Sequence, residues 1–328
     1  MRIPMLVIVL MIIIFCGFNI SLSQDFNFSA SRGKVAGAQE TNYDYYFKTE
    51  NGIISLEPQE KVETIRNFDV FQPRSIKLPF DNNFFKAASV FVFDVNNNSE
   101  IYSKNGDQIR QIASITKLMT ALVFLEHNPG WEKIKIISNS DRREGGRIYL
   151  YKGEKVFIKD LFNLSLIASA NTATMALVNS TGLGEKEFVN LMNQKAKELG
   201  LKNTHFDDPI GLSINNISTG REIATLAQKA FSRKEIREAV QKKEYSFKTL
   251  GGKDKKVYNT NFLIKNSPQK LTIIGGKTGY TEAAGYCLVT EFEEQGRKFI
   301  SVFLGEPSYY DRFKETRYLI REITNQIN

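Results

Sequence analysis

The stretch IASITKLMTAL, residues 112–122, places a serine three residues before a lysine at the start of an apolar helical pattern. On a helix, this spacing brings the side chains of Ser114 and Lys117 to one face, one turn apart. A serine hydroxyl is a weak nucleophile at neutral pH, but a lysine amine that is desolvated or set beside another cation can be neutral and accept its proton. The stretch is therefore a candidate activated nucleophile. Taken alone, the pattern arises more often from an N-cap serine followed by a solvated lysine.

The composition is that of a globular protein with a basic surface. The 328 residues are 42% hydrophobic and 24% charged, which is enough for a sizeable core in one large domain or two smaller ones. The net charge of +8 favours anionic partners or simply a soluble surface, and no basic block interleaved with aromatic residues indicates nucleic acid. The two histidines, His127 and His205, show no metal-ligand spacing, so we expect no metal and no cofactor.

The first 85 residues differ in character from the rest. Residues 1–23 begin with a positive charge, continue as an apolar run and end in small residues, which is the pattern of a secretory signal cleaved after Ser23. The apolar run at 5–20 is also nearly long enough to remain as an N-terminal membrane anchor, which needs about 20 residues. Both alternatives predict an exported protein. Residues 24–85, with polar residues and prolines between short apolar clusters, are expected to form a linker or a loosely packed extension.

The order of the expected elements predicts an α+β domain over residues 86–328. Strands near both ends of this region, with helices between them, give one antiparallel sheet flanked by helices, with a helical subdomain inserted. The connecting residues 232–270 are expected to be exposed connections and edge strands. The expected strands are 87–95, 100–103, 271–276, 284–290 and 298–304, and the expected helices follow Ser114 and cover 158–178 with a break at 169–171, 185–199, 218–231 with Ser218 as N-cap, and 311–327.

Three short motifs follow one another along the chain. They are Ser-x-x-Lys at 114–117, Ser-x-Asn at 169–171 and Lys-Thr-Gly at 277–279. Each is a weak signal alone, and the second by itself is more often a junction between helices whose polar groups are satisfied by serine and asparagine. In this order, however, the three form the signature of penicillin-binding proteins and serine β-lactamases.

The first two motifs suit acyl transfer. Ser114 would attack a carbonyl carbon, Lys117 would take its proton, and Ser169 would relay a proton between the nucleophile, the lysine and the leaving amine. Asn171 would hold Lys117 and the peptide group of the substrate. As a neighbouring cation, Lys277 would lower the pKa of Lys117.

The third motif suits recognition of the substrate. Lys277 and Thr278, at the edge of a strand, would bind a carboxylate at the substrate's terminus. Gly279 would let the substrate backbone lie close against the strand. The backbone N–H groups of Ser114 and Tyr280 would supply the two donors of an oxyanion hole.

Around these motifs the sequence resembles the D-alanyl-D-alanine carboxypeptidases, the low-mass penicillin-binding proteins or serine DD-peptidases. The resemblance covers about residues 85–305 and implies a DD-peptidase/β-lactamase-like fold. It also implies a serine that β-lactam inhibitors acylate, and removal of the terminal D-alanine from peptidoglycan stem peptides without a metal. The matching stretches are IASITKLMT at 112–120, LIASAN at 166–171 and GKTGYTEAAG at 276–285, with support from LGLKNTHF at 199–206 and NTN at 259–261.

The chain departs from the family pattern at several positions. Ala170 stands where many members have glycine, Thr172 where an acidic residue is frequent, and Tyr280 where a histidine is common. The oxyanion role of Tyr280 is unaffected, because it uses the backbone. Only 49 residues follow Gly279, so we expect no β-rich C-terminal domain, and any membrane attachment falls to the N-terminus.

Other activities remain open on the sequence alone. A β-lactamase commonly has a Glu-x-x-Leu-Asn run after Ser-x-Asn, and none is present here. A catalytically silent module that binds the cell wall would not need the intact serines and lysines of the three motifs. Carboxypeptidase and endopeptidase action are not distinguished, because both cleave a bond after D-alanine.

Overall fold

The computed structural model describes the strands Tyr46–Thr49 and Gly52–Ser55, residue Ile76, and residues 78–81, 83–265 and 272–327. The chain divides into two compact units, 1–71 and 72–328. In the first unit, β1 (Tyr46–Thr49) and β2 (Gly52–Ser55) form an antiparallel hairpin. The predicted signal or anchor at 1–23 and most of the predicted extension at 24–85 lie outside the described residues, so these domain boundaries stay predictions.

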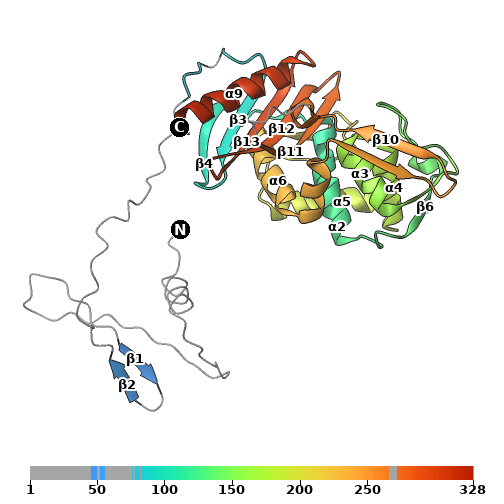
Figure 1. The fold of residues 1–328 in the computed structure, drawn as a ribbon, viewed down its shortest axis with the longest axis horizontal. Helices are drawn as coiled ribbons and strands as arrows, with labels where there is room; N and C mark the ends of the chain where they lie inside the picture. Colours follow the sequence, from blue (N-terminus) through green and yellow to red (C-terminus); the bar gives the residue numbers. More distant parts are fainter. Residues whose placement is uncertain are drawn as a thin grey trace, which may run out of the picture. The chain divides into compact units, whose positions relative to one another are not determined.

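The second unit is built on a five-stranded antiparallel sheet (Figure 1). Two strands from the start of this unit pair with three consecutive strands from its end, in the order β11-β12-β13-β3-β4. The predicted α+β class and its antiparallel sheet are therefore confirmed. The strands are β3 (Ser89–Asp94), β4 (Ser99–Lys104), β11 (Thr272–Thr281), β12 (Gly285–Glu294) and β13 (Arg297–Glu306).

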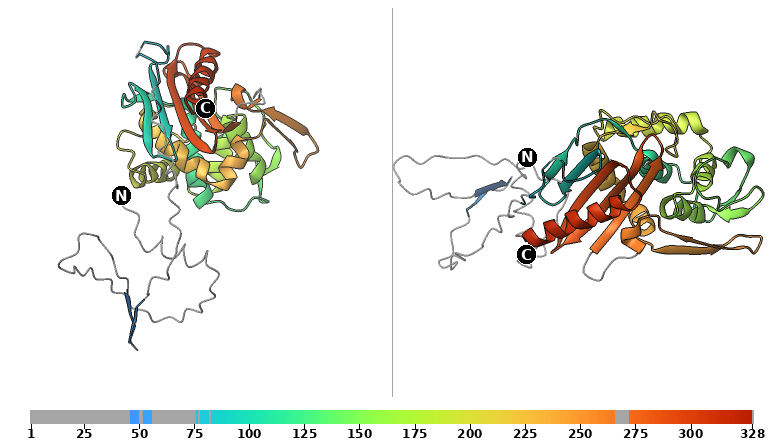
Figure 2. Two further views of the ribbon diagram at one scale, coloured as in Figure 1. Left: turned by 60° about the vertical axis from the view of Figure 1, so that its left-hand side comes forward. Right: turned by 90° about the horizontal axis from the view of Figure 1, so that it is seen from above.

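Helices cover both faces of this sheet, and Figure 2 shows α9 (Asp311–Ile327) lying along one of them. The helix α6 (Gly220–Ser232) contacts β3 and β13 from the other side. Because side chains alternate along a strand, both faces are apolar and buried. The α9 face holds Val90, Val92, Phe292, Phe299, Phe303, Leu319, Ile320 and Ile323, and the α6 face holds Phe91, Val289, Ile300, Val302, Leu304, Ile223 and Ala227.

A helical subdomain is inserted between β4 and β11, as predicted. Its helices share one apolar core with the α6 face of the sheet. None of the helices in the described part of the chain is long and apolar enough to span a membrane. The remaining elements are β5 (Arg110–Gln111), η1 (Ala113–Thr116), α2 (Lys117–Glu126), β6 (Ile134–Ile136), η2 (Asn139–Asp141), β7 (Lys155–Phe157), α3 (Ile158–Ile167), α4 (Asn171–Ser180), α5 (Glu185–Glu198), β8 (Ile217–Ser218), α7 (Lys234–Val240), β9 (Glu244–Lys248), β10 (Asp254–Tyr258) and α8 (Phe262–Lys265).

Two local predictions are corrected by the structure. The N-cap of α6 is Thr219 and not Ser218, because the Thr219 hydroxyl accepts a hydrogen bond from the backbone N–H of Glu222 while Ser218 belongs to β8. Residues 232–270 are not only exposed connections and edge strands, since they include α7. Only Ile236, Ala239 and Val240 of α7 are buried. The other residues of α7 are charged, so the sequence pattern did not indicate this short apolar face.

Candidate active site

Ser114 lies in the 3-10 turn η1, which continues directly into α2. Lys117 is the first residue of α2 and is fully buried, and its Nζ lies 2.8 Å from Ser114 Oγ. The preceding Ala113 has a φ of 46°, a left-handed conformation that costs energy in any residue but glycine and persists only where packing enforces it. The structure thus brings Ser114 and Lys117 together as predicted, within a tighter turn than an α-helix.

The amine of Lys117 is surrounded by neutral acceptors. Besides Ser114, Nζ donates to Asn171 Oδ1 at 2.9 Å and to the backbone oxygen of Ile210 at 2.6 Å. Burial lowers the pKa of Lys117 to about 7, and the carboxylate of Asp208 opposes this shift only in part. Burial is the main cause of this shift, and the repulsion between Lys117 and Lys277, which we expected to lower the pKa of Lys117, is expressed in the lowered pKa of Lys277. A substantial fraction of this amine is therefore neutral near pH 7 and able to accept a proton from Ser114.

Asn171 connects this lysine to the loop that follows η2. It is the first residue of α4, and its Nδ2 donates to the backbone oxygens of Glu144 at 3.1 Å and Gly145 at 2.9 Å. This loop therefore lies against Asn171. In this arrangement the amide donors of Asn171 are used by the loop, while its oxygen is used by Lys117.

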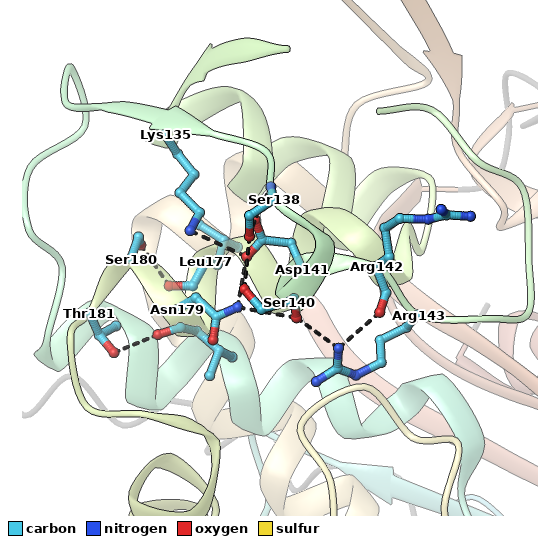
Figure 3. A network of polar contacts seen from close by, with 11 residues as sticks. Lys135, Ser138, Ser140, Asp141, Arg142, Arg143, Leu177, Asn179, Ser180 and Thr181 are labelled. Atoms are coloured by element: carbon cyan, nitrogen blue, oxygen red, sulfur yellow. Dashed lines mark hydrogen bonds and ion pairs between the residues drawn. The ribbon is translucent and has the colours of Figure 1, made fainter. Parts of the chain in front are cut away.

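Asp141 fixes the start of that loop, as Figure 3 shows. Its buried carboxylate accepts hydrogen bonds from Ser138 and from Asn179 Nδ2 at 2.7 Å and pairs with Lys135 at 3.2 Å. Burial alone would raise the pKa of Asp141, but the bonds from Asn179 and Ser138 and the charge of Lys135 outweigh it and hold the pKa below its usual value. Since Asn179 and Asn171 both belong to α4, one helix holds the loop at two points.

The second serine of the three motifs, Ser169, is hydrogen-bonded to the second lysine, Lys277. Ser169 lies between α3 and α4 with a φ of 56°, and its Oγ accepts a hydrogen bond from Lys277 Nζ at 2.8 Å. Lys277 is buried and also donates to the backbone oxygen of Thr278 at 2.8 Å. Burial lowers its pKa well below the usual value, and repulsion by Lys117 and Arg312 adds to the shift. Each lysine therefore holds one serine hydroxyl.

Two glycines let their own chain segments approach the nucleophile turn. A Cβ on Gly279 would lie 2.9 Å from the backbone oxygen of Ile112 and 3.1 Å from the nitrogen of Ser114. On the other side, a Cβ on Gly211, whose φ is 87°, would collide with the backbone oxygen of Ala113. The close approach at Gly279 is therefore made by the nucleophile turn, where the sequence had suggested the substrate backbone.

The loop carrying Gly211 was not among the predicted site residues. The carboxylate of Asp208 accepts hydrogen bonds from the backbone N–H groups of Ile210 and Gly211, both at 2.6 Å, and of Leu212 at 3.0 Å. This folding of the loop directs the Ile210 oxygen at Lys117. A backbone carbonyl carries no residue-type signal, and only the Asp-Pro-x-Gly turn pattern at 208–211 could have indicated it.

Arg312 is a further residue that the sequence analysis missed. It is buried, and one guanidinium nitrogen donates to the backbone oxygens of Gly279 at 3.0 Å and Cys287 at 3.2 Å. In the sequence, Arg312 could have been noticed because it lies on the apolar face of α9, at helical spacing from the buried Thr316 and Leu319. With Lys117 and Lys277 it makes three buried basic groups, and none of them forms an ion pair with a carboxylate of the described residues. Such a site favours an anionic ligand.

Thr278 and Tyr280 follow Lys277 and Gly279 alternately along β11. Thr278 Oγ1 donates a hydrogen bond to Thr260 Oγ1 at 2.6 Å, and the Tyr280 ring is 53% exposed. Because β11 is an edge strand of the sheet, every second N–H of it is free of partners within the sheet. The oxyanion role of the Ser114 and Tyr280 N–H groups stays a prediction. Among the described residues, no cluster of histidine, cysteine and carboxylate side chains could hold a metal ion.

Solved structures of DD-peptidases and penicillin-binding proteins share this fold. The crystal structure of the Streptomyces K15 DD-transpeptidase superimposes with a TM-score of 0.68 at 28% identity, covering 76% of this chain and 99% of that one. Penicillin-binding protein D2 from Listeria monocytogenes in its cefotaxime-bound form gives a TM-score of 0.64 at 30% identity, covering 74% and 99%.

Comparisons with curated sequences and families point the same way. A D-alanyl-D-alanine endopeptidase of Escherichia coli is 36% identical over 62% of this chain and 66% of its own length, so this chain spans just under two thirds of that relative. The D-alanyl-D-alanine carboxypeptidase DacF of Bacillus subtilis is 32% identical over 69% of this chain and 59% of its own length. The model of the family described as D-alanyl-D-alanine carboxypeptidase matches residues 79–308. The chain belongs to the D-alanyl-D-alanine carboxypeptidase family.

Proposed function

We propose that this protein is a serine-type D-alanyl-D-alanine carboxypeptidase that removes the terminal D-alanine from peptidoglycan stem peptides through an acyl-enzyme on Ser114. One observation carries the proposal. The Nζ of Lys117 lies 2.8 Å from Ser114 Oγ, and burial lowers the pKa of this lysine to about 7. A base with this pKa, at hydrogen-bond distance from a hydroxyl, can activate it at neutral pH.

Acylation transfers one proton and exchanges one bond. Ser114 Oγ forms an ester bond with the carbonyl carbon of the penultimate D-alanine while its proton passes to Lys117. The C–N bond to the terminal D-alanine then breaks, and the leaving amine takes up a proton. Ser169, whose hydroxyl accepts a hydrogen bond from Lys277 at 2.8 Å, is proposed to relay that proton. The backbone N–H groups of Ser114 and Tyr280 would stabilise the oxyanion.

Deacylation restores the free serine. Water adds to the ester carbonyl and loses a proton to Lys117, and that proton returns to Ser114 Oγ as the shortened peptide leaves with a new carboxylate. General acid–base catalysis of this kind contributes roughly 10²- to 10⁴-fold to the rate. Asn171 would keep the amine of Lys117 in place during both steps, since its Oδ1 lies 2.9 Å from Nζ.

The basic groups of the site support a substrate with a terminal carboxylate. Lys277, Thr278 and Arg312 lie along or behind β11, and the buried amine of the lysine and the guanidinium of the arginine lack a carboxylate partner among the described residues. An entering carboxylate would offset their mutual repulsion. The same contacts would bind the carboxylate of β-lactam inhibitors, and the related Listeria protein has been solved with cefotaxime bound.

Peptidoglycan lies outside the cytoplasm, so the proposal includes export. The apolar pattern at 1–23 supports it, either as a cleaved signal or as a retained N-terminal anchor.

Endopeptidase action on cross-linked peptidoglycan is the second candidate. It is favoured by the names of two relatives, the D-alanyl-D-alanine endopeptidases of Escherichia coli and Pseudomonas aeruginosa, at 36% and 35% identity. The chemistry at Ser114 is the same in both reactions, and only the leaving group differs.

Incubation with a defined monomeric pentapeptide and a cross-linked muropeptide dimer, followed by mass spectrometry, tests the proposal. We expect loss of one D-alanine from the monomer and no loss with Ser114→Ala. Nitrocefin provides the counter-test, because rapid and repeated hydrolysis would identify a β-lactamase, whereas slow formation of a stable adduct on Ser114 supports a peptidase. Unchanged release of D-alanine by Ser114→Ala would instead indicate a silent module and a contaminating activity.

A further inference from the structure

Four tyrosines form a continuous row beside the Lys-Thr-Gly segment, and we call Tyr280, Tyr286, Tyr309 and Tyr310 the tyrosine row. Tyr280 stacks on Tyr286 with ring centroids 4.2 Å apart, Tyr286 meets Tyr309 edge to face at 5.7 Å, and Tyr309 meets Tyr310 at 4.9 Å. Its members come from β11, from β12 and from the segment just before α9. Three chain segments thus build one aromatic surface.

The row starts on the same face of the sheet as Thr278. Residues two apart on a strand share a face, so Thr278 and Tyr280 point the same way, with about 7 Å between them along β11. Their partners on β12 are Leu288 and Tyr286, and Leu288 packs in one cluster with Phe313 of α9. Gly279 faces the opposite way, toward the nucleophile turn. The row therefore continues outward from the residue proposed to bind the carboxylate of the leaving D-alanine.

The row is both exposed and firmly supported. Tyr280, Tyr309 and Tyr310 are 53%, 41% and 68% exposed. Beneath them, the buried guanidinium of Arg312 lies 5.1 Å from the Tyr286 ring centroid and 4.8 Å from that of Tyr309. Tyrosines held in this way offer a large contact area at a low cost in conformational entropy, as they do in binding interfaces. An exposed aromatic surface next to a catalytic site is better explained by a ligand than by packing.

We propose that the tyrosine row is an extended leaving-group subsite that binds the second stem peptide of cross-linked peptidoglycan. This inference rests on the proposed function and adds a substrate class to it. A single leaving D-alanine would end at its carboxylate, which is proposed to bind beside Thr278. In a cross-linked dimer the leaving amine belongs to the side chain of a diamino acid, whose methylene groups and attached peptide continue past that point. Apolar methylene groups pack well on tyrosine rings.

The chemistry is the same as for the terminal D-alanine. Ser114 Oγ gains the D-alanyl carbonyl carbon, the amide C–N bond to the diamino acid breaks, and its amine leaves with the proton that Ser114 gave up. Water then hydrolyses the ester. The row has no part in these bond changes, and it acts only by holding the leaving stem before the bond breaks.

The test compares one substrate with a short leaving group and one with an extended leaving group. The full chain, the variant Tyr310→Ser and the ring-retaining Tyr310→Phe are each assayed for kcat/KM on a monomeric pentapeptide and on a cross-linked muropeptide dimer. Tyr151→Ser is the matched control, because Tyr151 is 57% exposed and its ring contacts Lys255 and not the row. Acylation by a fluorescent penicillin checks that every variant is folded and active.

We expect Tyr310→Ser to lose about tenfold in kcat/KM on the dimer and less than about twofold on the monomer, with Tyr310→Phe and Tyr151→Ser unchanged on both. An equal loss on both substrates, or no loss on the dimer, overturns the inference and leaves the proposed function standing. So does a wild-type protein that cleaves the monomer and not the dimer. A wild-type protein that cleaves neither overturns the proposed function, and the subsite with it.

Discussion

The nucleophile turn and the Lys-Thr-Gly segment of β11 each present a buried lysine to a serine at 2.8 Å, yet the two lysines have different surroundings. The amine of Lys117 is held by neutral acceptors, with the carboxylate of Asp208 near enough to raise its pKa. The amine of Lys277 is repelled by Lys117 and Arg312 in addition to being buried. Equal distance to a serine therefore does not mean an equal role. The first lysine is suited to exchange a proton, and the second is suited to receive an anion.

The largest effect is expected when the amine of Lys117, the proposed base, is removed. Lys117→Met keeps an unbranched apolar side chain of similar shape without the amine, and we expect acylation of Ser114 by a fluorescent penicillin to fall about 10³-fold or more. The control is thermal unfolding, because the variant must retain its fold for the rate to be interpreted. Retention of more than about a tenth of the wild-type rate would show that another group activates Ser114.

The pH dependence of acylation tests the same lysine without a mutation. Only the neutral amine accepts a proton, so a pKa of about 7 predicts that the rate rises with pH up to about 7 and is level above it. At pH 5 we expect a rate about a hundredfold below the plateau, since each pH unit below the pKa reduces the neutral fraction tenfold. Stopped-flow measurements from pH 5 to 9 give the profile. A rate that is flat across this range contradicts the assignment of Lys117 as base.

Substitution of Lys277 tests binding of the substrate carboxylate separately from proton transfer to Lys117. For Lys277→Met we expect kcat/KM for a pentapeptide with a free terminal carboxylate to fall about 10- to 100-fold, mainly through KM, because a charged hydrogen bond is lost. An amidated peptide should lose far less, and the exposed Lys253→Met serves as the matched control. A fall in kcat with unchanged KM would assign Lys277 to the chemical step and remove the distinction between the two lysines.

The smallest effect concerns the contact between the two regions. In Gly279→Ala the new methyl group would meet the Ile112 oxygen at 2.9 Å and must push β11 away from the nucleophile turn. Overpacking of this kind costs about 1–3 kcal/mol, and we expect a lower Tm together with a several-fold slower acylation. Gly251→Ala is the control, because its Cβ would meet nothing closer than 3.9 Å. Equal behaviour of the two variants would show that the glycine is not needed for this approach.

The candidate site was predictable where its signal is local or carried by a motif. The Ser114–Lys117 pair follows from helical spacing, and Ser169 and Lys277, 108 residues apart, were linked only by the order of the three motifs. Arg312 and the carbonyl of Ile210 were not predicted. A carbonyl is common to all residues, and a buried arginine on an amphipathic helix is recognised only when the surface against which it packs is known.

The sequence by itself determined the α+β class, the strands at both ends of the second unit and the residue types of the candidate site. The reason is that periodicity and short motifs depend on neighbours in the chain. It placed the N-cap of α6 one residue early and missed α7, whose buried face is only three residues wide. Only the tertiary structure decided that Lys277 donates a hydrogen bond to Ser169 and why Gly279 must be glycine. It also decided that burial is the main cause of the lowered pKa of Lys117. The physical reason is that desolvation and close contact sum over every group around an atom, and most of those groups lie far away in the sequence.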